Sequence, residues 1–259
     1  MKVATGLVVG KKPTPELAAK AVESAMAKAN IHAPSSVLLF LTSEFAADPH
    51  SAIVAAAKAA SCTQIIGCSA SGIFTEEDWV LDSPAAAAMV FSDLNFNHPN
   101  VDHSTENNGE NLLLTLAAPN AINTTWLNTP NLNAFRFGGV SGDATGHGPF
   151  SVWQNGKGTT QGYCEVSLHN ASGAIAASHG LKIISAPRRI TEVKSNDVLS
   201  IANLPAFATL NAAWQKHNNA AEHFPYHQLM AVYASKASAL ERGEYNLASL
   251  IIANEDNQS

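Results

Sequence analysis

Two short segments rich in glycine and serine hold the residues best suited to bind a small ligand. Residues 67–72 read GCSASG and residues 138–143 read GGVSGD, and each segment follows an apolar stretch typical of a strand. Small residues let a ligand or another backbone approach a strand end closely. Successive backbone N–H groups can bind an anion there. A tight turn whose serines satisfy local backbone groups fits the same pattern, so both interpretations stay open.

The ligand-binding candidates come from both segments. In the first, the hydroxyls of Ser69 and Ser71 would hydrogen-bond a carboxylate or another anion. In the second, Asp143 would pair with an ammonium group if the ligand were an amino acid. The full set of candidates is Gly67, Cys68, Ser69, Ser71, Gly138, Gly139 and Asp143.

Cys68 also raises the hypothesis of an enzyme. A cysteine nucleophile needs a thiol with a lowered pKa and a base within reach. A buried and inert cysteine is the alternative, and no histidine lies in a motif that would decide between them. The sequence contains no GxSxG, P-loop or HExxH motif. We therefore predict no catalytic residue.

The ten histidines raise the question of a metal site. His223 and His227 are four residues apart, which would place two ligands on one face of a helix. Pro225 lies between them and favours an extended segment or a turn instead. We find no third ligand at a recognisable spacing, and histidines with ordinary hydrogen bonds are the alternative. We predict no metal site.

Strands and helices alternate in the first third of the chain. We predict a strand over 2–9, a helix from Pro15 to about residue 30, and a strand over 36–42 whose continuous apolar run is typical of a buried strand. A helix over 51–61 and a strand over 64–66 follow, and this strand is expected to end at Gly67. Together they form a βαβ unit, whose crossover should be right-handed.

The middle of the chain repeats this plan. Residues 111–116 (NLLLTL) resemble residues 36–42 (SVLLFLT), and the strand expected over 134–137 ends at two glycines, as the earlier strand ends at one. The repetition suggests an internal duplication with two matched strand ends.

Beyond residue 150 the pattern becomes mostly antiparallel. Asn155-Gly156 is a strong hairpin signal, further strands are expected within 174–193, a helix over 205–217, a polar turn over 241–244 and a last strand over 247–252. The predicted fold class is mixed α/β, or α+β. It has βαβ units with a mixed sheet in the N-terminal half, and a largely antiparallel sheet with helices in the C-terminal half.

Composition excludes several classes. With 46% hydrophobic residues the chain should fold, and its net charge of −6 argues against a nucleic-acid partner. The densest basic cluster is too thin for that role: Lys182, Arg188, Arg189 and Lys194. Three cysteines without a CxxC pair fit a reducing, cytoplasmic location. Lys11 and Lys12 directly follow the apolar run 3–10, where a signal peptide would end in small residues, so we expect no signal peptide, and no apolar run is long enough for a membrane span.

Read in order, the segments resemble the FIST family, a sensory module of bacterial signal-transduction proteins and of some F-box proteins. The N-terminal half is similar to a FIST N-domain, and the rest to the start of a FIST C-domain. The segments that carry the likeness are SVLLFLTSEF, IIGCSASGIF, AAAAMVF, RFGGVSGDA, VWQNGK, GYCEVSL, GLKIISAPRRITEV, LPAF, AEHFP and RGEYNLASLIIANEDNQS. The connection before residue 134 is shorter than usual in the family, so its helix is expected to shrink to a turn.

The resemblance implies a FIST N-type domain over 1–180 and a partial FIST C-type domain over 181–259, since relatives continue with more strands. It also implies a non-enzymatic sensory protein that binds a small ligand. Because the sequence shows no output module, the signal would pass to a separate signalling protein, and an unpaired sheet edge would allow a homodimer. Some FIST relatives are described as haem-binding gas sensors. A non-covalent haem with a histidine ligand is therefore the alternative cofactor, with His103, His147, His179 and His223 as equal candidates.

Overall fold

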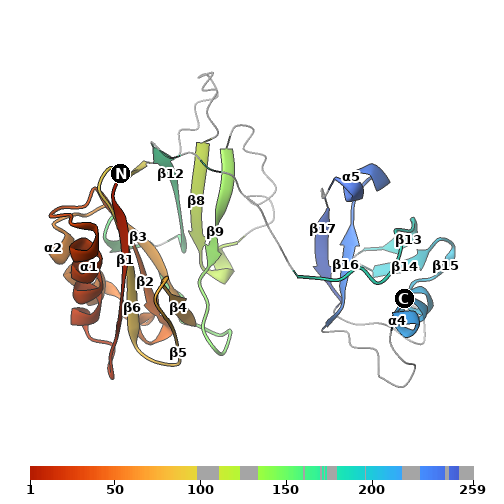
Figure 1. Ribbon diagram of the computed structural model, residues 1–259. Coiled ribbons are helices and arrows are strands. Elements are labelled where there is room, and N and C mark those ends of the chain that lie inside the picture. The colour runs from red at the N-terminus through yellow and green to blue at the C-terminus, as the bar shows by residue number, and fades with distance from the viewer. Residues whose placement is uncertain are drawn as a thin grey trace. The chain divides into compact units, whose positions relative to one another are not determined.

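The chain folds into two compact units, Met1–Ala176 and Ala177–Ser259. Figure 1 shows the elements of the computed structural model. The structure describes residues 1–97, 111–122, 134–159, 161–169, 171, 173, 180–195, 197–217, 228–242 and 245–250.

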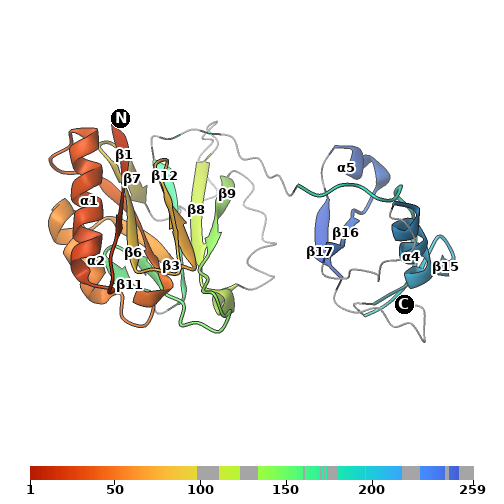
Figure 2. The same ribbon diagram turned by 60° about the horizontal axis from the view of Figure 1, so that its bottom comes forward.

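The first unit contains a six-stranded mixed sheet covered on one face by two helices. Its strand order is β1-β6-β2-β3-β10-β11, and β2 and β3 are its parallel pair. The strands are β1 (Val3–Val9), β2 (Ser36–Thr42), β3 (Ile65–Ala70), β6 (Ala85–Phe91), β10 (Val152–Gln154) and β11 (Lys157–Gly158). Figures 1 and 2 show α1 (Pro15–Ala29) and α2 (His50–Ala60) on the same face of this sheet.

Small residues let α1 lie close against the sheet. The helix begins at Pro15, after Thr14 in the N-cap position, and its C-cap Asn30 adopts a left-handed φ of 50°. A stripe of apolar residues is buried along it, namely Leu17, Ala18, Ala21, Val22 and Ala25. A Cβ atom at Gly6 of β1 would lie 2.2 Å from the Ala21 carbonyl oxygen, so the contact requires glycine.

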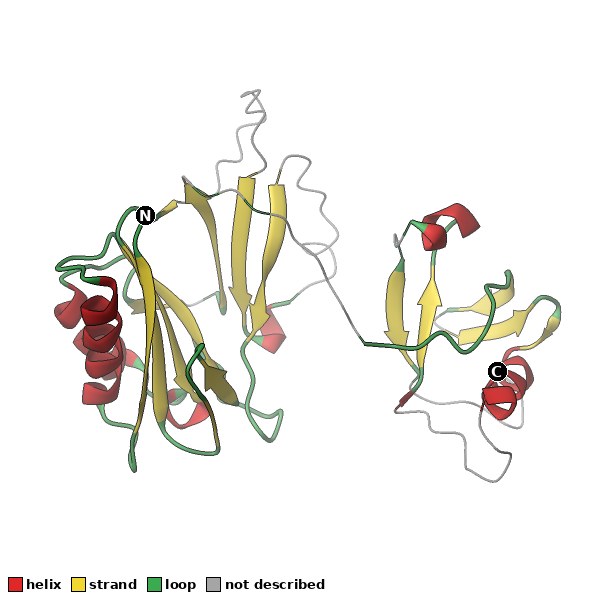
Figure 3. Ribbon diagram, viewed as in Figure 1, coloured by secondary structure: helices red, strands yellow, loops and turns green. Residues whose placement is uncertain are grey.

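A second, four-stranded sheet packs on the other face of the first. Its order is β7-β12-β8-β9, with strands β7 (Asn95–Asn97), β8 (Asn111–Ala117), β9 (Ala134–Val140) and β12 (Tyr163–His169). Ile66 and Cys68 of the first sheet share one apolar cluster with Leu114 and Cys164 of the second. Figure 3 shows the resulting layers of helices, sheet and sheet in the first unit.

The two sheets of this unit confirm the internal duplication. In the first sheet β1 pairs antiparallel with β6, β6 pairs antiparallel with β2, and β2 pairs parallel with β3. The strands β7, β12, β8 and β9 repeat the same order and the same three pairings. The duplicated sheets therefore place β3 and β9 in equivalent positions.

The predicted ends of these two equivalent strands were wrong. Strand β3 continues through Gly67 to Ala70, and β9 continues through Gly138 to Val140. A Cβ atom at Gly67 would lie 1.6 Å from the Leu39 carbonyl oxygen, and one at Gly138 would lie 1.7 Å from that of Thr115. The glycines do not end the strands. They allow each strand to approach its parallel neighbour more closely than a side chain would permit.

Two hairpins connect elements of the first unit. The hairpin expected at Asn155-Gly156 is confirmed, with left-handed φ values of 52° and 71° joining β10 to β11. A second hairpin, β4 (Gly72–Phe74) and β5 (Trp79–Leu81), was not predicted.

After β8 the chain forms a short 3-10 turn, η2 (Pro119–Ala121). Residues 123–133 of the connection that was predicted to be reduced lie outside the described residues.

The described residues of the second unit form antiparallel strands and two helices. Strands β13 (Ile190–Lys194), β14 (Asp197–Ile201) and β15 (Leu204–Pro205) form one sheet, and β16 (Met230–Tyr233) and β17 (Asn246–Ser249) form another. The helix expected over 205–217 is α4 (Ala206–His217).

Several predictions for the second unit fall partly on residues that the structure does not describe, and one was partly wrong. Of the strands expected within 174–193, the described residues contain only β13; residues 180–189 form no strand, so the prediction was wrong there, and residues 174–179 lie outside the described residues. Strand β17 covers the beginning of the last strand expected over 247–252, and residues 251 and 252 lie outside the described residues. The helix α5 (Ala237–Glu241) was not predicted, and half of the expected polar turn at 241–244 lies outside the described residues. In the part of the chain that the structure describes, no helix is long and apolar enough to cross a membrane. The observed fold is mixed α+β, as predicted.

We expect Gly67→Ala and Gly138→Ala each to lower the free energy of unfolding by about 2 kcal/mol or more, because the new methyl group meets a backbone carbonyl that cannot move aside. Urea unfolding followed by circular dichroism measures the change.

Gly139→Ala is the matched control, since no atom lies within 4 Å of a Cβ built there. Its effect should stay within about 0.5 kcal/mol. Equal effects at Gly138 and Gly139 would contradict the close-approach explanation.

Candidate functional site

The structure joins the two glycine- and serine-rich segments through buried hydroxyl groups. The Oγ atoms of Ser69 and Ser141 lie 2.8 Å apart, and the Ser141 hydroxyl donates to the Ser69 carbonyl oxygen at 2.7 Å. The backbone N–H of Ser151 donates to Ser69 Oγ at 3.0 Å. Both Ser69 and Ser141 are buried. We call Ser69, Ser141 and Ser151 the serine junction.

The serine junction uses groups that were candidates for a ligand. The Ser69 hydroxyl is already hydrogen-bonded within the protein, and the neighbouring Gly67 and Cys68 are buried as well. Ser71 is exposed, and Gly139 faces open space. The structure therefore brings the two segments into contact, and this contact consists of buried hydrogen bonds within the protein.

Asp143 holds its own loop together. Its carboxylate accepts hydrogen bonds from the Thr145 hydroxyl at 2.7 Å and from the backbone N–H groups of Gly146 and Gly148. The Thr145 hydroxyl is the main reason that the pKa of Asp143 lies below its ordinary value, and these N–H groups lower it further. Each bond favours the ionised carboxylate and orders residues 143–148.

Cys68 lies in the apolar layer between the two sheets. Burial raises the pKa of Cys68 to about 12, with a smaller contribution from Cys164, and burial raises the pKa of Cys164 to about 11. A nucleophile needs the opposite shift and access to solvent. The geometry therefore fits the inert, buried cysteine.

A polar cluster crosses three strands of the second sheet and was not predicted. The Oε2 atom of Glu165, on β12, accepts two hydrogen bonds. One comes from the Thr115 hydroxyl of β8 at 2.6 Å, and the other comes from Nε of Arg136 on β9 at 2.7 Å and forms an ion pair. Thr115 is buried, and the side chains of Arg136 and Glu165 are 21% and 13% exposed. We call Thr115, Arg136 and Glu165 the polar triad.

The duplicated sheet shows what is unusual about the polar triad. Thr115 pairs with Glu165 and Gly138, and Arg136 lies two residues before Gly138. The same relations around Gly67 identify the equivalent residues of the first sheet, which are Leu39, Ala88 and Ile65. Those three are buried in the apolar cluster beneath α1 and α2. One copy of the sheet therefore carries an apolar group where the other carries an ion pair.

A sequence signal for the polar triad does exist. Arg136 interrupts the run AFRFGGV, and Glu165 interrupts YCEVSLH, so each strand contains one isolated charge. Charged residues are rarely covered by protein unless they are paired. The sequence does not show that the two charges meet, because the pairing depends on the register of three strands.

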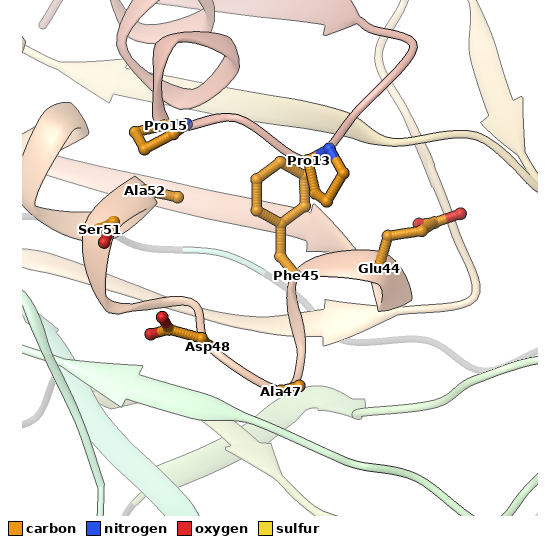
Figure 4. A pocket seen from close by; sticks show the side chains of 8 residues that line it. All are labelled: Pro13, Pro15, Glu44, Phe45, Ala47, Asp48, Ser51 and Ala52. Atoms are coloured by element: carbon orange, nitrogen blue, oxygen red, sulfur yellow. The ribbon is translucent and has the colours of Figure 1, made fainter.

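One further hollow lies between the beginnings of α1 and α2 (Figure 4). It has a volume of about 310 Å³, and its lining residues are Pro13, Pro15, Glu44, Phe45, Ala47, Asp48, Ser51 and Ala52. Helix N-termini attract anions, but the two charged groups in this lining are carboxylates. None of the predicted ligand-binding residues lines it.

The described residues contain no group of three potential metal ligands. His147 is exposed in the loop after Asp143. His103, His179, His223 and His227 lie outside the described residues, so the haem alternative stays a prediction.

We expect the loop formed by residues 143–148 to lose its order in acid. The folded pKa of Asp143 is lowered, so the stabilising hydrogen bonds are present at neutral pH and are lost as the pH falls below the ordinary Asp range and through the lowered pKa. Amide NMR shifts of Gly146 and Gly148 should follow this titration. Asp143→Asn should remove the transition, and its persistence in that variant would contradict the assignment.

We also expect Cys68 and Cys164 to resist thiol reagents at pH 8 in the folded protein, because burial keeps them protonated and covered. A colorimetric thiol assay should detect at most the partly exposed Cys62 before unfolding and all three cysteines in urea. Fast labelling of Cys68, identified by mass spectrometry, would restore the nucleophile hypothesis.

Comparison with known proteins shows the family to which the chain belongs. A family model described as the FIST N domain matches residues 35–203, which is more than half of the chain, and a search of curated proteins found no match. The matched region contains the serine junction and the polar triad, and it extends past Ala176 into the second unit. FIST domains are sensory domains of signal-transduction proteins. The chain therefore belongs to the FIST N domain family.

Proposed function

We propose that this protein is a non-enzymatic sensor that binds a small ligand at the polar triad and passes the signal to a separate partner protein in the cytoplasm. The observation that carries the proposal is the ion pair in one copy of a duplicated sheet, at positions where the other copy has aliphatic residues. The sensory role of the FIST family supports it.

Stability alone gives little reason for this ion pair. Replacing a covered ion pair by apolar residues of similar volume is often neutral or stabilising, because both charges lose their hydration when covered. The first sheet shows that Leu39, Ala88 and Ile65 suit this topology. A charged pair that remains partly accessible is better explained by recognition of a polar ligand.

The charges of the polar triad suit a ligand that carries both signs, such as an amino acid. Arg136 would bind a carboxylate and Glu165 an ammonium group. This assignment gives Glu165 the role that the sequence suggested for Asp143, whose carboxylate already bonds its own loop. Gly138, one of the candidates from the sequence, pairs with Thr115 across β8 and β9 and so lies next to the proposed site.

The serine junction offers a route from the site to the first sheet. Arg136 lies on β9, and Ser141 follows this strand directly and bonds to Ser69 at the end of β3. A change in β9 would therefore alter a buried hydrogen bond between the two sheets. The ligand shifts this equilibrium only by its difference in affinity for the two arrangements.

Thermal-shift screening of the full chain tests ligand binding. The compounds would be amino acids, small carboxylic acids, small amines and haemin. A ligand at 100 times its dissociation constant should stabilise the protein by about 2.7 kcal/mol. Amino acids should give the shift. A shift with haemin, accompanied by a Soret band, would instead support the haem alternative, and a flat screen would contradict small-ligand sensing.

We expect Glu165→Gln to abolish the shift caused by the ligand found in this screen. Glu77→Gln is the matched control, because Glu77 also forms an ion pair of 2.7 Å, with Lys28, on α1. The combined change Thr115→Leu, Arg136→Ile and Glu165→Ala gives the second sheet the residues of the first. This variant should fold and lose binding, whereas retained binding would place the ligand elsewhere.

A further inference from the structure

The β4–β5 hairpin presents three large apolar side chains to solvent. Phe74, Trp79 and Leu81 are 79%, 66% and 50% exposed. Phe74 pairs with Trp79 across the hairpin, and Leu81 pairs with Gly72, so all three side chains lie on one face. We call these three residues the hairpin face.

The opposite face of the hairpin is packed and holds the hairpin in place. Ile73 and Val80 are buried in a cluster with Ala85 and Ala87, and β4 lies beside β2 and β6 (Figure 1). The hairpin cannot turn over to cover Phe74 and Trp79 without exposing this cluster.

Contacts at the tip fix the hairpin further. Glu76 accepts a hydrogen bond from the Thr5 hydroxyl of β1, and Glu77 pairs with Lys28 of α1 at 2.7 Å. The Asp78 carboxylate accepts a hydrogen bond from the backbone N–H of Trp79 at 2.8 Å. A fixed, exposed pair of aromatic side chains is typical of an interaction surface, because tryptophan supplies much of the binding energy at protein interfaces.

The charges around the hairpin face restrict what can bind there. Residues 72–82 carry four carboxylates and no lysine or arginine, and Lys28 of α1 pairs with one of these carboxylates, that of Glu77, so negative charge remains in excess. A second copy of the same hairpin would bring four more carboxylates against these, and an anionic lipid surface would be repelled in the same way. A partner with basic residues beside apolar ones would be attracted.

We infer that the hairpin face is the docking surface for a basic, amphipathic segment of a partner protein. Apolar side chains of that segment would cover Phe74, Trp79 and Leu81, and its lysines or arginines would face the surrounding carboxylates. The surface supplies the partner contact that the proposed function requires, and it rests on that function for its role.

A pair of synthetic peptides tests the inference on the full chain. One is a fluorescently labelled amphipathic helix of leucine and lysine, and the other has glutamate in place of lysine. The lysine peptide should bind, as measured by fluorescence anisotropy, and the glutamate peptide should not. Raising the salt concentration should weaken the complex, because exposed charges contribute to it. Equal binding of both peptides would overturn the charge argument.

Variants locate the surface. The double change Phe74→Ser and Trp79→Ser should weaken binding of the lysine peptide by about tenfold or more. Ile183→Ser is the matched control, since Ile183 is 81% exposed in the second unit. Asp82→Asn removes one carboxylate at a φ of 55°, which asparagine tolerates, and should weaken binding less. Unchanged affinity in the double variant would overturn the inference.

Two further results separate this inference from the proposed function. If the double variant still shows the small-ligand thermal shift and the wild type does not bind the lysine peptide, the docking surface is wrong and the sensor stands. If the lysine peptide binds at the hairpin face and no small ligand binds, the surface stands and the sensor is wrong. Binding to phosphatidylserine vesicles, lost in the double variant, would identify a lipid contact and overturn the protein partner.

Discussion

The first unit depends on the buried hydrogen bonds of the serine junction. Ser69 and Ser141 are 72 residues apart in the sequence, and each follows the same kind of close strand contact in its own copy of the sheet. Their hydroxyls would be costly to bury without partners. By bonding to one another they satisfy these hydroxyls where the ends of β3 and β9 meet, so the two sheets can pack face to face.

The glycine contacts and the serine junction act together. Gly67 and Gly138 bring β3 and β9 close to their parallel neighbours, and the polar ends of the same strands then reach each other. This arrangement fixes the second sheet on one face of the first while α1 and α2 cover the opposite face. The polar triad lies on the other face of the second sheet, away from the apolar cluster that the two sheets share.

Duplication also explains how the proposed sensor combines stability with recognition. The first copy retains an apolar group beneath helices and supplies core packing. The second copy places an ion pair at the equivalent positions, where charges cost stability and form the proposed ligand site. The hairpin face is separate from both the apolar group of the first sheet and the polar triad of the second. It lies on the connection between β3 and β6, which Ile73 and Val80 anchor. The proposed ligand site and the proposed docking surface therefore lie on different surfaces of one unit.

The sequence by itself determined the local elements. Its continuous apolar runs located β2 and β8, the proline at residue 15 located the beginning of α1, Asn155-Gly156 located a hairpin, and the similarity of two segments revealed the duplication. Only the tertiary structure decided that β3 and β9 continue past their glycines, that Ser69 bonds to Ser141, and that Arg136 meets Glu165. The reason is physical. Periodicity and turn preferences act over a few residues, whereas these contacts depend on the register of strands that are far apart in the chain.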